Sequence, residues 1–108
     1  MADVALCIQS AELNWFKTLE PGTRLCDMID MYTAFLKKRY IGESVAGFWK
    51  RIESLEVKYG NKVLFRDHRF VWEDGEKTLE QVGLADGPNL FASFSIQEHR
   101  FDSAEELV

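Results

Sequence analysis

The second half of the chain, from Lys62 to Ile96, is a series of short apolar segments separated by tight polar turns. Residues 62–65 and 70–73 form two such segments across a four-residue turn, and each has the length of a short strand. From Leu90 onward, larger apolar residues alternate with smaller or more polar ones, which is typical of a strand with one face on a core. The stretch therefore predicts several closely spaced strands. Its other elements are the turn Asp74-Gly75, a short helical turn at Leu79-x-x-Val82-Gly83-Leu84 and the turn Asp86-Gly87-Pro88.

The first half of the chain predicts a hairpin followed by a helix. Val4, Leu6 and Ile8 stand at alternate positions, the period of a strand, and residues 12–19 are interpreted as a second strand. A Glu-Pro-Gly break follows, and apolar residues then recur at three- and four-residue steps up to Gly42, which predicts one amphipathic helix. This order of strands and helix indicates the α+β fold class. The predicted stripe consists of Leu25, Met28, Ile29, Tyr32 and Phe35 or Leu36.

The segment between this helix and the next strand, about residues 41–61, is interpreted as an insertion. Its apolar residues fit an amphipathic helix from about Ser44 to Leu55 or beyond, with Ser44 as the N-cap. However, alternating apolar residues at 55–59 run into Gly60-Asn61, a suitable two-residue hairpin turn. The sequence favours the helix and leaves a strand open for the end of the segment.

A chain of 108 residues is expected to form one domain, here residues 1–97, with an acidic tail or the start of a linker at 98–108. Its net charge of −5 offers no general attraction to nucleic acid or to an anionic membrane surface, so neither is expected as a partner. The sequence pattern shows no secretory leader and no apolar run near the ~20 residues of a membrane span, which predicts a cytoplasmic protein. Cys7 and Cys26 lie outside any metal-ligand spacing and are expected to be buried free thiols; no cofactor is expected.

Three short motifs, together with the order of elements, resemble the ubiquitin-like family. Leu19-Glu20-Pro21 leads into the helix, Trp72-Glu73-Asp74-Gly75 is followed by Thr78-Leu79, and Asn89-Leu90-Phe91-Ala92 takes the place of the final strand. The resemblance covers Ala2 to Ile96. It implies a ubiquitin-like β-grasp fold, in which a four- to five-stranded mixed sheet packs on one main helix, with a helical insertion before the third strand.

The end of the sequence departs from the family in a way that bears on function. Ubiquitin and its conjugated relatives end in Gly-Gly, whereas no glycine follows Ile96 here. The resemblance therefore implies a non-catalytic protein-interaction domain, the N-terminal module of a scaffold or adaptor protein, that binds a protein or peptide. The alternative is a ubiquitin-like modifier whose conjugation signal lies beyond residue 108. Self-association into a homo-oligomer is left open.

Ubiquitin recognises partners through an apolar patch on its third and fifth strands, and the resemblance transfers this patch by position. Leu64 and Phe91 would supply the apolar contacts, while Arg66 and Arg69 would favour an acidic, hydrophobic peptide. A second hypothesis places the binding site in the insertion, whose aromatic residues would either anchor a partner or cover an exposed end of the core. The candidate residues are Leu64, Arg66, His68, Arg69, Phe91 and Ser93 for the patch, and Phe48 and Trp49 for the insertion.

A small enzyme or metal protein is the weaker alternative. Asp67-His68 is the only pair of neighbouring side chains that suggests catalysis or metal binding. However, both residue types are common in tight turns because they suit the backbone conformation of a turn. The seven glycines are scattered singly, so the sequence has no glycine-rich phosphate loop. We therefore expect no catalysis and no metal, and His68 is the residue on which either activity would depend.

Overall fold

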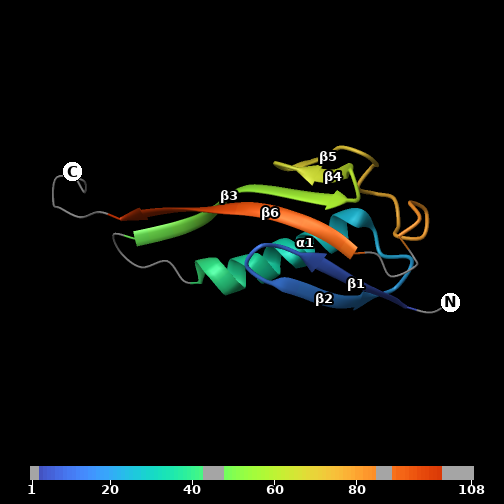
Figure 1. The fold of residues 1–108 in the computed structure, drawn as a ribbon, viewed down its shortest axis with the longest axis horizontal. Coiled ribbons are helices and arrows are strands. Elements are labelled where there is room, and N and C mark those ends of the chain that lie inside the picture. Colours follow the sequence, from blue (N-terminus) through green and yellow to red (C-terminus); the bar gives the residue numbers. More distant parts are fainter. Residues whose placement is uncertain (1–2, 43–47, 85–88, 101–108) are drawn as a thin grey trace.

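The computed structural model describes residues 3–42, 48–84 and 89–100, which form one sheet and one main helix (Figure 1). The predicted N-terminal hairpin, main helix and final strand are confirmed. The elements are β1 (Val4–Gln9), β2 (Asn14–Leu19), α1 (Leu25–Leu36) with the π-helical turn η1 (Lys37–Ile41), β3 (Phe48–Tyr59), β4 (Lys62–Arg66), β5 (Arg69–Phe70) and β6 (Asn89–Arg100).

The strands form a mixed sheet in the order β2-β1-β6-β3-β4-β5. β1 and β6 are parallel, and the other neighbouring pairs are antiparallel. Figure 1 shows α1 lying along one face of this sheet. The described residues thus confirm the α+β architecture, with six strands where four or five were predicted. The difference arises because the segment predicted to be helical is itself a strand.

The helix predicted from about Ser44 to Leu55 is wrong for the residues that the structure describes, because β3 begins at Phe48; residues 44–47 lie outside the described ranges. The pairing of β3 with β6 shifts register between Ile52 and Ser54. One extra residue is therefore accommodated in β3 as a β-bulge. As a result, Ile52 and Leu55 both pack on the core although they are three residues apart, a spacing that is also typical of a helix stripe.

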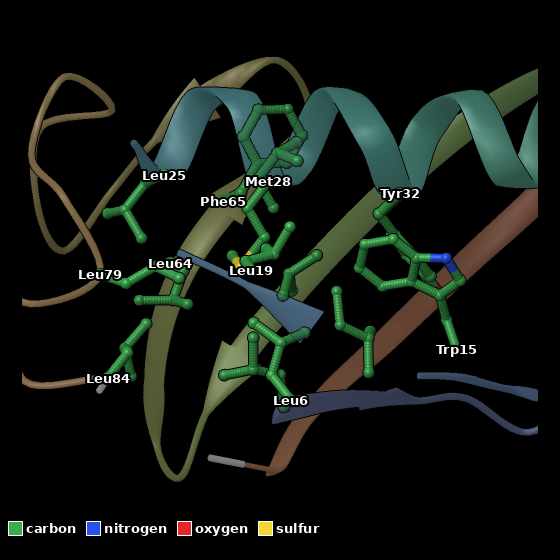
Figure 2. Packing of buried hydrophobic residues seen from close by; sticks show 14 of the residues in the cluster. Leu6, Trp15, Leu19, Leu25, Met28, Tyr32, Leu64, Phe65, Leu79 and Leu84 are labelled. Atoms are coloured by element: carbon green, nitrogen blue, oxygen red, sulfur yellow. The ribbon is translucent and has the colours of Figure 1, made fainter. Parts of the chain in front are cut away.

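The core lies between α1 and the sheet. The stripe predicted for the helix is buried, and the Trp15 ring on β2 contacts the Tyr32 ring of α1, with 5.4 Å between ring centroids (Figure 2). The start of α1 is held by the chain before β6: the Leu25 and Cys26 amides donate to the carbonyls of Lys77 and Gly75, each at 2.9 Å. These bonds satisfy helix amides that have no partner within the helix, so α1 forms without a side-chain cap.

β3 and β6 continue together past the C-terminal end of the helix (Figure 1). Their paired residues run from Lys58 with Phe91 to Phe48 with Arg100. β6 therefore extends through Arg100, whereas the sequence indicated a strand ending at Ile96 and a tail from residue 98. Residues 101–108 lie outside the described ranges.

Candidate functional site

The sheet face turned away from α1, here called the outer face, carries two exposed phenylalanines. Residues that are direct partners on neighbouring strands point to the same face. Phe16 on β2 is the partner of Cys7 on β1, and Phe91 on β6 is the partner of Gln9 on β1 and Lys58 on β3. The side chains of Phe16 and Phe91 are 73% and 49% exposed.

The surface beside Phe16 is hollowed. The hollow has a volume of about 550 Å³. Cys7 contributes to its lining and is a buried free thiol, as predicted, whereas Cys26 is free but only half-buried. An aromatic side chain next to a hollow can act as an anchor while a partner side chain fills the hollow. The lining residues are Ala5, Leu6, Cys7, Phe16, Lys17, Thr18 and Asn89.

Basic side chains follow the two phenylalanines across the outer face. Arg66 on β4 donates from Nε to the Glu56 carboxylate at 2.7 Å, and the Lys58 ammonium lies 3.6 Å from the same carboxylate. The hydrogen bond from Arg66 holds the pKa of the Glu56 carboxyl below its usual value. Arg69 on β5 is the partner of Arg66, which adds a further positive charge. This part of the surface is therefore locally basic although the chain as a whole is acidic.

Part of the predicted patch is brought together on this face. Ser93 is the partner of Glu56, which is in turn the partner of Arg66, so these residues form one row across the sheet. Phe91 is two residues from Ser93 on the same strand and face. Arg66, Arg69, Phe91 and Ser93 thus share the outer face; whether they bind a partner stays a prediction.

Leu64 does not belong to the exposed surface, so its predicted role as an apolar contact is wrong for this structure. Its side chain is only 1% exposed. β4 pairs Phe65 with Val57 but Val63 with Lys58, so Leu64 is an extra residue in β4. In such a bulge two successive residues oppose one residue of the partner strand. The bulge thus interrupts the alternation, and Leu64 and Phe65 are both buried beneath α1 (Figure 2).

The two aromatic residues predicted as anchors in an insertion lie instead at the start of β3. Phe48 is the backbone partner of Arg100, and Trp49 that of His99. Trp49 is half-buried, and the Arg51 guanidinium lies over its ring, 5.4 Å from the centroid. Trp49 therefore belongs to the part of the β3–β6 pair that extends past the helix, away from Phe16.

Phe16 was not predicted as a site residue, although the alternation of apolar residues in β2 indicates that its side chain is exposed. Trp15 and Leu19 are buried and stand four residues apart, so they share the core face of β2. Phe16 follows Trp15 directly, so its side chain points to the opposite face of β2, which is the outer face. A large aromatic residue out of phase with the core positions of a strand was therefore the available indication.

His68 lies in the turn between β4 and β5, where Asp67 and His68 have φ values of 45° and 74°. Positive φ at both central residues matches the tight hairpin turns that favour Asn-Gly. The Asp67 amide donates to the Leu55 carbonyl at 3.0 Å, so this turn also fastens β3. The side chain of His68 lines a groove beside α1 and not the outer face.

Replacing His68 by glycine is expected to stabilise the domain by about 0.5–1 kcal/mol, because glycine adopts positive φ without the steric cost that a side chain pays. Urea unfolding followed by circular dichroism measures the change. Asp67→Gly relieves the same strain but removes a carboxylate that accepts from the Leu55 amide at 3.4 Å, so it is expected to gain less. A loss of stability in His68→Gly would mean that the imidazole makes a structural contact.

The fold is the ubiquitin-like β-grasp: a mixed sheet in which the N-terminal hairpin, the main helix and the last strand share one core. In a comparison with solved structures, the chain is similar to the EccD5 ubiquitin-like domain from Mycobacterium xenopi, with a TM-score of 0.53 and 14% sequence identity. The match covers 88% of this chain and 97% of that domain. No protein-family model matches the sequence, and no curated protein matches it.

In residues 3–42, 48–84 and 89–100, no three His, Cys, Asp or Glu side chains gather as a metal site would require. None of the helices there has the length and apolar character needed to cross a membrane.

Proposed function

We propose that the chain is a non-catalytic ubiquitin-like interaction domain, a module of a scaffold or adaptor protein, that binds a protein partner on its outer face. The observation that carries this proposal is the pair of exposed phenylalanines, Phe16 and Phe91, on a sheet face opposite the helix. Large aromatic side chains are costly to leave in water and are enriched at the energetic centres of protein interfaces.

The charges beside the phenylalanines define the partner further. Arg66 and Lys58 share one carboxylate, that of Glu56, and Arg69 is a neighbour of Arg66. The outer face therefore combines apolar anchors with unbalanced positive charge. The partner surface that complements it is apolar where it meets Phe16 and Phe91, and acidic where it meets the basic residues of β3, β4 and β5.

The double variant Phe16→Ser/Phe91→Ser is expected to weaken partner binding at least about tenfold, because a single buried aromatic anchor contributes roughly 2 kcal/mol or more. Proteins captured from native lysate by the immobilised wild-type and variant domains would be compared by quantitative mass spectrometry. Binding of the recovered partner would then be measured with purified proteins.

Met31→Gln is the matched control, because Met31 is an exposed apolar residue on α1, on the other side of the sheet. It should retain wild-type capture. Both variants must keep the wild-type circular dichroism spectrum. Unchanged affinity of a folded Phe16→Ser/Phe91→Ser domain for its partner would remove the outer face as the binding surface.

A further inference from the structure

The edge of β3 that faces β4 is only partly covered. β4 pairs with β3 from Glu56 to Tyr59. Asp67 then substitutes for one more strand residue, because its amide donates to the Leu55 carbonyl and its carboxylate accepts from the Leu55 amide. From Arg51 to Ser54, no described strand pairs with β3 on this side. An edge of this kind can accept an added strand through main-chain hydrogen bonds.

A groove with a volume of about 580 Å³ runs along this edge. One flank is α1 and η1, and the other is the open part of β3. Apolar side chains form part of its lining, among them Ile29 of α1, Ile52 of β3 and Phe70 of β5. The volume suits a few side chains of one extended segment. The groove is on the helix side of the sheet and is therefore distinct from the outer face.

The helix flank of the groove has a negative and a positive end. Asp30 and Lys37 both line it, both are exposed, and neither forms an ion pair with another described residue. They are two helical turns apart, about 10 Å at 1.5 Å per residue. Thr33 lies between them and also lines the groove. An extended chain covers this distance in three to four residues.

We propose that this groove binds an extended peptide segment of a partner protein, which adds to β3 as an antiparallel strand. A basic side chain of the segment lies beside Asp30, an apolar one lies beside Thr33 and contacts Ile52, and an acidic one lies beside Lys37. α1 and β3 run in opposite directions (Figure 1), so a segment antiparallel to β3 passes Asp30 first. Its basic residue therefore precedes its acidic residue. This site goes beyond the outer-face function and does not depend on it.

The test uses a capped peptide of sequence Thr-Lys-Thr-Val-Thr-Glu-Thr, which places its basic, apolar and acidic side chains on one face of a strand. Its control has Lys and Glu exchanged and the same composition. Both would be titrated into the ¹⁵N-labelled domain and followed by amide chemical shifts. The first peptide should shift the amide signals of Arg51–Ser54 in a saturable manner. It should also bind roughly fivefold to tenfold more tightly than the second, because exchanging Lys and Glu replaces two exposed ion pairs by like-charge contacts.

The variant Asp30→Lys/Lys37→Glu reverses the charges of the flank and is expected to reverse the preference between the two peptides. Three outcomes would overturn the proposal. The first is that neither peptide shifts the β3 amides. The second is that the shifts fall at Gln9 and Phe91, which would support the outer face only. The third is that sedimentation shows a dimer and hydrogen exchange shows that its β3-edge amides are protected, which would make a second copy the occupant.

Discussion

Leu79→Ala is expected to lower the free energy of unfolding by about 3 kcal/mol, the magnitude typical of a buried leucine truncated in a packed core. Leu79 is fully buried although it lies in a segment without a regular strand or helix. Its amide donates to the Thr23 carbonyl at 2.9 Å, which ties the segment to the start of α1. Figure 2 shows Leu79 close to Leu25 and Leu84, so its loss leaves a cavity between the start of α1 and the segment that contains Leu79 and Leu84.

Guanidinium chloride unfolding, followed by tryptophan fluorescence and circular dichroism, measures this effect. Val82→Ala is the control in the same segment, because Val82 is only half-buried. Its truncation should lower the free energy of unfolding by about 1 kcal/mol. If Leu79→Ala lowers the free energy of unfolding by no more than Val82→Ala does, residues 78–84 are not an integral part of the core.

The second large effect is expected in alkaline solution and depends on Tyr32. Burial raises the pKa of the Tyr32 phenol to about 12, from its ordinary value near 10. The neutral phenol is therefore favoured by the folded state. Its contribution is fully present below pH 10 and is lost as the pH rises through 12, because the unfolded chain releases the proton first. The loss amounts to roughly 2–3 kcal/mol over that interval, at about 1.4 kcal/mol per pKa unit.

Tyr32→Phe removes the ionisable group and keeps the ring between Trp15 and Phe35. Between pH 10 and 12, its stability should therefore fall less steeply than that of the wild type. Urea midpoints measured at intervals of half a pH unit would show the difference. Parallel curves for the two proteins would contradict the assignment, because another group would then drive alkaline unfolding.

The sequence predicted the fold well where the local pattern is regular. The alternation in β1 and β6 and the single stripe of α1 follow the periods of a strand and a helix without interruption. Each element thus carried its own signal, and their order was sufficient for the fold class. The polar turns between Phe65 and Phe70 and after Trp72 were equally clear.

Two β-bulges explain what the sequence pattern did not reveal. The extra residue in β3 places Ile52 and Leu55 on one face, and their three-residue spacing resembles that of a helix stripe. The extra residue in β4 directs the Leu64 side chain into the core. Bulge positions depend on the partner strand, so one strand's sequence does not specify them. Of the candidate site, Phe91, Arg66 and Arg69 could be placed from sequence. Phe16 could have been placed from its phase relative to Trp15, whereas the groove beside β3 depends on where β4 ends.

The parallel pairing of β1 with β6 joins the beginning of the chain to its end. Neither the N-terminal hairpin nor α1 can complete its core before β6 is available, because Leu90 on β6 is fully buried beside Ile8 on β1. During synthesis on a ribosome, the domain therefore closes only after Asn89 and the residues that follow it have left the exit tunnel. Until then the apolar faces of β1 and α1 lack β6 as a packing partner, and closing the core requires a contact between parts of the chain that are distant in sequence, which slows folding.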